Sequence, residues 1–247
     1  MVDWGIGGVG LVRLLDVAAP GLPITYWSDT GATPYGLVRT GDLVRRLRMI
    51  VDRLAGEGCT EVVLACNAAS TVVDRLGRTA VPVEGIITHG IAAVPTSANG
   101  VIGVVGGRRL VASGAYRRGL ASPRRDVRSR VAQPLSAHIE AGRTGNAEFV
   151  ADLARITTPL RDASAVVLAC THYPAAAQWF ADQLPGTTLV DPAGHLAASI
   201  ADRHPGASVE RSTEAERVFL TSGDPGAMRD GAEAAWGTTI TARRATT

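Results

Sequence analysis

Two cysteines lie in segments of nearly the same sequence. Cys66 follows Glu-Val-Val-Leu-Ala at 61–65, and Cys170 follows Ala-Val-Val-Leu-Ala at 165–169. Each apolar, β-branched run is typical of a buried strand, and a sequence that can open a helix follows it. Ligands of open α/β sheets bind beyond the carboxyl ends of strands, so we expect both thiols at a binding site. A cysteine at a helix start also lies near the positive end of the helix dipole, which favours the reactive thiolate.

Two thiols presented in the same way can act as acid/base groups on either side of a planar intermediate, or as metal ligands. Zinc-binding cysteines are usually a few residues apart, whereas Cys66 and Cys170 are distant in the chain, so we expect no metal site. Free cysteines are also commonly buried as small apolar residues, and we interpret Cys59 in this way. Burial alone does not explain a duplicated cysteine at a strand end, so Cys66 and Cys170 are the candidate catalytic pair.

The composition excludes several classes of function. The 247 residues are 46% hydrophobic and 19% charged, which is ordinary for an α/β protein. No apolar run reaches the roughly 18 residues of a membrane span. All 25 basic residues are arginine. Without lysine the chain cannot form the Schiff base of pyridoxal phosphate enzymes or complete a P-loop, so any amino-acid chemistry here must proceed without pyridoxal phosphate.

Charge and cysteine usage define the expected partners and compartment. A net charge of +2 is too small to indicate nucleic-acid binding, and we interpret the arginine-rich stretch 108–130 as a solvated face. The three cysteines lack the spacing of a disulfide scaffold. The first residues also lack the charged and then apolar order of a signal peptide. We therefore expect a cytoplasmic protein with free thiols.

The elements that position the cysteines follow from the apolar periodicity. We expect the stretch 119–131 to be a loop or an exposed strand. The duplicated strand and cysteine favour two α/β domains, 1–89 plus 191–247 with Cys66 and 90–190 with Cys170. The expected strands are 24–27, 62–65, 101–105, 166–168, 188–190 and 217–220, and the expected helices are 43–54, 66–76, 134–141, 148–160 and 193–201.

The glycines of segment 5–10 match the dinucleotide fingerprint Gly-x-Gly-x-x-Gly, and Asp29 follows the next strand about where a ribose-binding acid belongs. Only two residues precede Asp3, so the full apolar strand that the fingerprint requires is missing. The charge of Asp3 would also repel a pyrophosphate. We interpret the segment as a tight turn between a strand and a helix.

Five short motifs extend over nearly the whole chain. They are Asp-Trp-Gly-Ile-Gly-Gly at 3–8, Tyr-Trp-Ser-Asp-Thr-Gly-Ala-Thr-Pro-Tyr-Gly at 26–36, Ala-Cys-Asn-Ala-Ala at 65–69, Ala-Cys-Thr-His-Tyr-Pro at 169–174 and Thr-Ser-Gly-Asp-Pro at 221–225. These resemble the motifs of the glutamate racemase family, within the wider aspartate/glutamate racemase superfamily. The fourth is similar to the family's Gly-Cys-Thr-His-Tyr-Pro signature almost letter for letter.

The resemblance implies two pseudo-symmetric three-layer α/β domains with mainly parallel sheets and an active-site cleft between them, in a homodimer. It also implies racemisation of an amino-acid-like substrate without a cofactor. One cysteine would remove the Cα proton, and the other would reprotonate the opposite face. By the same resemblance Asp3 would assist Cys66, whereas His172 and Glu140 would assist Cys170. The substrate-binding positions that it implies are Trp4, Pro34, Tyr35, Gly36, Asn67, Ala68 and Thr171.

The chain departs from the family where that pocket is formed. Trp4 replaces a serine, Ala68 replaces a threonine, and Gly107 and Leu110 replace the threonines of a Gly-Thr-x-x-Thr turn. A hydrogen bond to a charged group contributes about 1.5–3 kcal/mol, so these losses would weaken glutamate binding strongly. We therefore predict a racemase or epimerase of another amino acid or related acid. The alternatives are a ligand-binding homologue in which Trp4 plugs the cleft, and a cysteine-dependent decarboxylase or isomerase.

Overall fold

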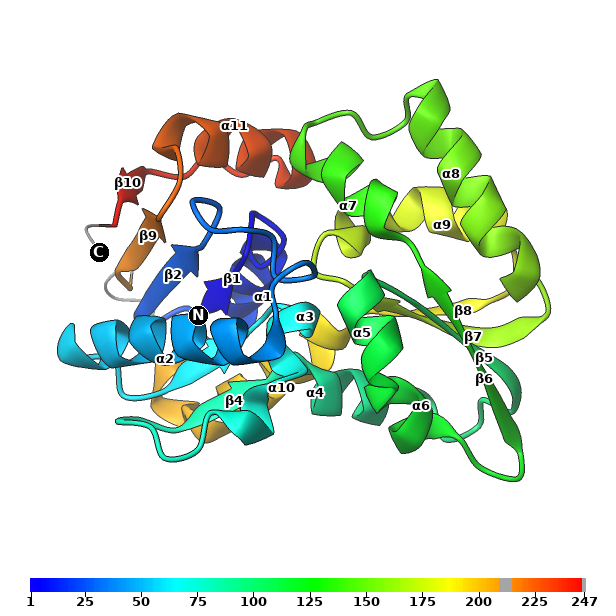
Figure 1. Ribbon diagram of the computed structural model, residues 1–247, viewed down its shortest axis with the longest axis horizontal. Helices are drawn as coiled ribbons and strands as arrows, with labels where there is room; N and C mark the ends of the chain where they lie inside the picture. Colours follow the sequence, from blue (N-terminus) through cyan, green and yellow to red (C-terminus); the bar gives the residue numbers. More distant parts are fainter. Residues whose placement is uncertain (209–214, 246–247) are drawn as a thin grey trace.

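The computed structural model describes residues 1–208 and 215–245, whose strands form two sheets (Figure 1). The first sheet has the strand order β10-β9-β2-β1-β3-β4, and the second has the order β6-β5-β7-β8. Neighbouring strands in both sheets are parallel. Because parallel strands end at the same edge, residues that follow β1 and β3 share one edge of the first sheet. Residues that follow β5 and β7 share one edge of the second.

Six of the strands overlap the predicted ranges 24–27, 62–65, 101–105, 166–168, 188–190 and 217–220. The strands of the first sheet are β1 (Val2–Asp3), β2 (Ile24–Ser28), β3 (Val62–Leu64), β4 (Val83–Gly85), β9 (Arg217–Thr221) and β10 (Ala242–Arg244). Those of the second sheet are β5 (Gly100–Gly106), β6 (Arg125–Val131), β7 (Ala163–Ala169) and β8 (Thr188–Val190).

Helices surround both sheets. They are α1 (Val9–Ala18), α2 (Thr40–Gly56), α3 (Asn67–Ser70), α4 (Ile86–Ala92), α5 (Arg108–Ser113), α6 (Ala115–Leu120), α7 (Gln133–Glu140), α8 (Ala147–Thr157), α9 (Ala177–Gln183), α10 (Pro192–Arg203) and α11 (Pro225–Trp236). Short 3₁₀ helices are η1 (Val73–Arg75), η2 (Thr158–Leu160), η3 (Tyr173–Ala176) and η4 (Pro205–Ser208). Within the part of the chain that the structure describes, no helix combines the length and apolar character needed to cross a membrane.

Each sheet lies between two apolar cores, because successive strand side chains point to opposite faces. In β3, Val63 packs with α1 and α10, whereas Val62 and Leu64 pack with α2. In β7, Val166 packs with α7, α8 and α9, whereas Val167 packs with α4 and α6. Helices therefore cover both faces of each sheet, and the predicted three-layer α/β fold with parallel sheets is confirmed.

The two sheets draw on different parts of the chain. The strands of the first sheet lie within 2–85 and 217–244, and those of the second lie within 100–190. We propose the predicted domain ranges, 1–89 plus 191–247 and 90–190, since their boundaries fall in α4 and directly before α10. Positions 209–214 and 246–247 of the first range lie outside the described residues.

The helix predicted over 66–76 is broken after one turn. α3 ends at Ser70, and η1 follows. Ser70 Oγ donates to the carbonyl oxygens of Leu64 and Cys66, at 3.0 and 2.9 Å. Side-chain bonds of this kind compete with helical hydrogen bonding, which explains why the helix stops.

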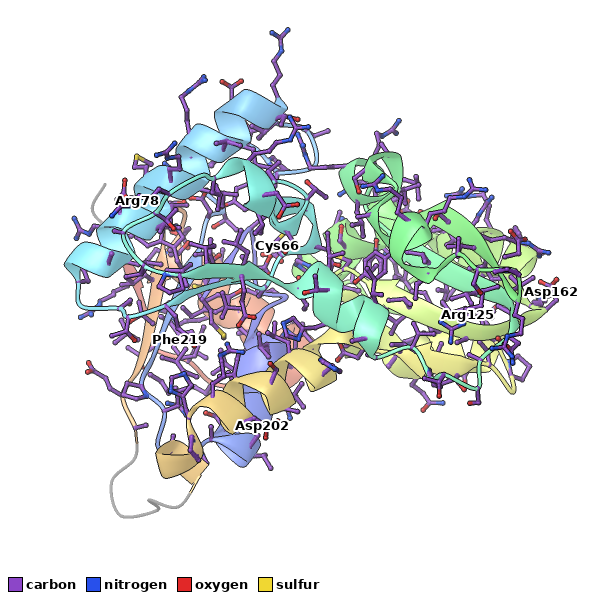
Figure 2. All side chains as sticks on the ribbon, turned by 90° about the horizontal axis from the view of Figure 1, so that it is seen from below. Cys66, Arg78, Arg125, Asp162, Asp202 and Phe219 are labelled. Carbon is purple, nitrogen blue, oxygen red and sulfur yellow. The ribbon has the colours of Figure 1, made fainter. Side chains whose placement is uncertain are left out.

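The prediction that 108–130 forms a solvated face is wrong for part of the stretch. It folds into α5, α6 and most of the edge strand β6. Arg125 donates from Nε to the carbonyl of Ala98 at 2.9 Å and from Nη2 to that of Pro95 at 2.8 Å. Arg125 lies at the end of the molecule away from Cys66 (Figure 2). Its side chain therefore stabilises the turn before β5.

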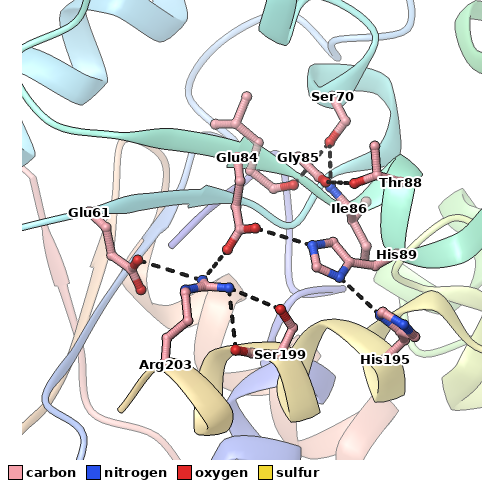
Figure 3. A network of polar contacts seen from close by, with 11 residues as sticks. Glu61, Ser70, Glu84, Gly85, Ile86, Thr88, His89, His195, Ser199 and Arg203 are labelled. Atoms are coloured by element: carbon pink, nitrogen blue, oxygen red, sulfur yellow. Dashed lines mark hydrogen bonds and ion pairs between the residues drawn. The ribbon is translucent and has the colours of Figure 1, made fainter. Parts of the chain in front are cut away.

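A polar network joins α4 and α10, the helices at which the chain crosses from one sheet to the other (Figure 3). His89 Nδ1 lies 3.1 Å from His195 Nδ1, and His89 Nε2 lies 3.1 Å from Glu84 Oε2. Arg203 pairs with Glu84 and lies 3.5 Å from Glu61 Oε2. The hydrogen bond with His89 and the charge of Arg203 hold the pKa of Glu84 below its usual value, against the effect of partial burial.

We predict that Glu84→Gln lowers the free energy of unfolding at pH 7 by about 1 kcal/mol, because it removes the charge that pairs with Arg203. The lowered pKa means that this stability is present above the ordinary glutamate pKa of about 4.3 and disappears as the pH falls through the lowered value. Urea unfolding of both proteins from pH 7 to about pH 3 measures the difference. Glu57→Gln, at an exposed pair with Arg53, is the matched control. A difference that widens on acidification would contradict the prediction.

Candidate active site

A cavity of about 340 Å³ is lined by elements of both sheets. Cys66, which follows β3, lies near the centre of the molecule where the cyan and green segments meet (Figure 2). Cys170 follows β7 and lines the same cavity. The structure brings together every site residue that the sequence singled out: Asp3, Trp4, Pro34, Tyr35, Gly36, Cys66, Asn67, Ala68, Glu140, Cys170, Thr171 and His172.

The thiol of Cys66 interacts with the carboxyl group of Asp3, the last residue of the adjacent strand β1. Asp3 accepts from the Trp4 N–H at 2.7 Å and from Thr171 Oγ1 at 2.8 Å. Burial raises the pKa of Asp3 despite these bonds and the charge of His172. Burial, and then the charge of Asp3, raise the pKa of the Cys66 thiol well above its usual value. The predicted thiolate at a helix start is therefore wrong for Cys66, because α3 is one turn long and desolvation dominates.

Cys170 has a different partner. Its sulfur lies 3.7 Å from Nδ1 of His172, whose Nε2 pairs with Oε2 of Glu140. Burial alone would lower the pKa of His172, but its bonds with Cys170 and Glu140 raise it well above the usual value. Burial likewise opposes ionisation of Glu140, yet the hydrogen bonds from His172 and the Ile6 N–H lower its pKa. His172 and Glu140 are therefore a buried imidazolium–carboxylate pair beside the sulfur.

Glycines in the turn after β1 make room for these side chains. A Cβ atom on Gly5 would overlap the carboxylate of Glu140, and one on Gly7 would overlap Thr171 and His172. The turn joins the two-residue strand β1 to α1, as the interpretation of a tight turn predicted. The glycines at 5 and 7 are therefore needed because Glu140, Thr171 and His172 pack directly against the turn.

The loop after β2 forms another wall. Tyr35 donates from its hydroxyl to Asp29 Oδ2 at 2.8 Å, and Asp29 also pairs with Arg46, so Asp29 is a buried structural acid. Trp4 Nε1 donates to the Ala32 carbonyl at 3.0 Å, which holds the indole against this loop. Arg109 of α5 donates from Nε to the Tyr35 carbonyl at 2.8 Å. The guanidinium therefore links the loop to the second sheet.

Asn67 lines the cavity, and within the described part of the chain only one end of its side-chain amide is hydrogen-bonded. Its Oδ1 accepts from the Tyr116 hydroxyl at 3.0 Å, which leaves Nδ2 as the free end of the group. Asn67 is 3% exposed, and among the described residues its Nδ2 is buried without a hydrogen-bond partner. Buried donors are normally satisfied, so this donor is an exception in the wall of the cavity next to Cys66.

Sequence reasoning missed most of the wall that α7 contributes. Gln133, Ser136, Ala137 and Ala141 line the cavity together with Glu140. Ser136, Ala137, Glu140 and Ala141 follow Gln133 by three, four, seven and eight positions, which is the spacing of one helix face. Once Glu140 was assigned to the site, this spacing could have predicted the other lining residues of the helix. Gly107, Arg109, Leu110 and Ala169 complete the lining. The first three lie in or next to the turn whose departures from the family motif the sequence showed.

The arrangement supplies two thiols with separate acid/base partners. The charge of Cys170 contributes to the raised pKa of Cys66, so the two sulfurs interact electrostatically. A carbon acid held between them could lose a proton to one sulfur in its thiolate form and gain a proton from the thiol of the other. Within residues 1–208 and 215–245, no three His, Cys, Asp or Glu side chains are grouped so that they could hold a metal ion.

Comparisons with known proteins identify the family. A family model described as Asp/Glu/Hydantoin racemase matches residues 16–200. The glutamate racemase of Desulforudis audaxviator is 32% identical over 246 residues, which cover 93% of this chain and 90% of that protein. The glutamate racemase of Beutenbergia cavernae is 31% identical and covers 92% of this chain and 85% of its own.

Solved structures agree. The glutamate racemase from Thermus thermophilus in complex with β-chloro-D-alanine superposes with a TM-score of 0.86 at 26% identity, covering 99% of this chain and 95% of that one. The isoform RacE1 from Bacillus anthracis, at 24% identity, shares the fold with a TM-score of 0.88 over 99% of this chain and 96% of its own. Since the family match covers most of the sequence, as the motifs predicted, we conclude that the chain belongs to the Asp/Glu/Hydantoin racemase family of isomerases.

Proposed function

We propose that the protein is a cofactor-independent amino-acid racemase or epimerase that inverts Cα by proton transfer between Cys66 and Cys170. The observation that carries the proposal is that both cysteines line one cavity, each beside its own acid/base partner. Relatives named glutamate racemase support the reaction class. From the family resemblance we also propose a homodimer in the cytoplasm, and light scattering would test the dimer.

In the proposed reaction, the thiolate of Cys170 removes the Cα proton and becomes a thiol, which leaves a planar carbanion. Cys66, whose raised pKa keeps it protonated at neutral pH, gives its proton to the opposite face and becomes a thiolate. The hydrogen has then changed faces, and the two sulfurs have exchanged protonation states. His172 would offset the charge on Cys170. Before a turnover in the other direction, Asp3 would take the proton of Cys66 while His172 gives one to Cys170, so that thiol and thiolate are exchanged.

We propose that the substrate is an amino acid or related acid other than glutamate. Four positions that lack the family's hydroxyl groups, Trp4, Ala68, Gly107 and Leu110, all line the cavity. Trp4 does not fill it, since about 340 Å³ remains. A volume in this range suits a small ligand, which favours turnover over a plugged, binding-only homologue.

Replacing either cysteine with serine tests the two-base mechanism. We expect racemisation to fall at least about 100-fold in Cys66→Ser and in Cys170→Ser, because each removes one proton-transfer group. Each variant should still exchange the Cα hydrogen of one enantiomer with retention, because the remaining thiol returns a deuteron to the face from which it took the proton. The two variants should exchange opposite enantiomers.

The measurement is NMR of Cα exchange in D₂O, with separate enantiomers across a panel of amino acids, followed by chiral analysis of the products. Cys59→Ser, which changes the cysteine outside the cavity, is the matched control and should leave exchange unchanged. Exchange of the same enantiomer by both variants would rule out opposed bases.

Glu140→Gln tests the charge pair. The bonds with Cys170 and Glu140 raise the pKa of His172, so loss of the carboxylate lets burial lower it. His172 then loses its proton at a lower pH, and the alkaline limb of kcat/KM should move toward lower pH. At pH 8 we expect kcat/KM to fall about 10- to 100-fold. The pH profile measures this, with Glu148→Gln on α8 as control, and an unmoved alkaline limb would contradict the assignment.

The substrate proposal predicts poor turnover of glutamate. We expect kcat/KM for glutamate to lie at least about 100-fold below that of the preferred amino acid, because several hydrogen-bond donors are missing. Circular dichroism follows racemisation, and mass analysis detects loss of CO₂ if the enzyme is a decarboxylase. Racemisation of glutamate at a rate equal to that of the best substrate would reject the altered-substrate proposal.

A further inference from the structure

The cavity-lining face of α7 begins at Gln133 and ends at Glu140. These residues are seven positions apart, so they lie about 10 Å from each other along the helix axis. Glu140 pairs with His172 beside Cys170. Gln133 is therefore two helical turns from the proposed reacting groups, within reach of a substrate side chain that extends along α7.

The amide of Gln133 is oriented by the protein. Its Oε1 accepts from the Arg108 N–H at 3.3 Å. A Cβ atom on Gly107 would lie 3.0 Å from this oxygen, and one on Gly36 would lie 3.4 Å from it. Oε1 thus faces the walls of the cavity. Among the described residues, Gln133 Nε2 has no hydrogen-bond partner, so the NH₂ group is free to donate to a ligand.

Gln133 and Gly107 form a matched pair. A Cβ atom at position 107 would come as close as 3.0 Å to Gln133 Oε1, which is tighter than almost all real contacts of that kind. A larger residue at 107 would therefore displace the amide. Gly107 stands where the family motif has a threonine, so one hydroxyl donor is missing from the pocket. The absence of a side chain at Gly107 leaves room for the amide of Gln133 from α7.

The cationic side chains of the cavity lining are already engaged. Arg109 donates to the carbonyls of Tyr35 and Val38, and the imidazolium of His172 pairs with Glu140. All three nitrogens of the Arg109 guanidinium donate within the protein, so a substrate carboxylate near Gln133 would compete with these neutral acceptors for the hydrogen bonds of Arg109 and would otherwise meet a neutral amide and the side chain of Leu110. Burying a charge without a charged partner is far more costly than burying a neutral polar group that is hydrogen-bonded.

We propose that Gln133 is a specificity-determining residue that donates a hydrogen bond to the uncharged side-chain oxygen of an α-amino acid carrying a carboxamide. The enzyme then prefers glutamine-like substrates to glutamate, whose side chain has the same length and a negative charge. The inference rests on the proposed function and names the substrate class of that site.

The test measures kcat/KM for Cα exchange in D₂O with glutamine, glutamate and methionine, the last being an apolar side chain of similar length. We expect the full-length enzyme to prefer glutamine to each of the others by about tenfold or more. Gln133→Met should lower kcat/KM for glutamine about tenfold and leave that for methionine within about twofold. Gln178→Met, at an exposed glutamine of α9, is the matched control and should change neither.

A second variant guards against loss of folding in Gln133→Met, which thermal melting would reveal. Gln133→Glu retains an acceptor for the Arg108 N–H and adds a charge, so kcat/KM for glutamate should fall more than that for methionine. Equal or faster exchange of glutamate in the full-length enzyme would overturn the inference and leave the proposed racemisation standing. An equal fall in kcat/KM for all three substrates in Gln133→Met would also overturn the inference about Gln133 and leave the proposed racemisation standing. Absence of cysteine-dependent exchange with every amino acid would overturn both.

Discussion

Close contact between the turn after β1 and the residues of the second sheet is the constraint on which the site depends. Thr171 donates to Asp3 at 2.8 Å, and the Ile6 N–H donates to Glu140 at 3.1 Å. Gly5 allows this approach, because a side chain there would overlap the Glu140 carboxylate. A methyl group at Gly5 would displace the Glu140 carboxylate, which pairs with His172 beside Cys170.

The same local sequence places the two thiols in different electrostatic surroundings. Cys66 is buried next to the acid Asp3, and both effects raise the pKa of its thiol. Cys170 lies beside His172, which Glu140 keeps protonated. Burial sets the direction of the pKa shift for Asp3 and Cys66, whereas hydrogen-bonded partners reverse the effect of burial for Glu140 and His172. A duplicated strand and cysteine thus become an acid and a base in the proposed reaction.

Much of the fold and the site could be predicted from local patterns. Apolar β-branched runs predicted β3 and β7, and parallel strand order places the residues after them at sheet edges. The helix predicted over 66–76 failed, because Ser70 bonds back to the strand and to Cys66. The arginine-rich stretch 108–130 was also misread, since Arg109 donates to a loop far away in the chain.

By itself the sequence predicted which residues would carry the proposed chemistry and determined that each cysteine follows a buried strand, because strand patterns and cysteine-flanking motifs are local properties. The tertiary structure alone decided what those residues touch. It brought Glu140 to His172, engaged Arg109 with Tyr35, and bonded Gln133 Oε1 to the Arg108 N–H while leaving Nε2 without a partner among the described residues. The physical reason is that burial, pKa and hydrogen-bond partners are set by segments distant in the chain, whose approach no local pattern encodes.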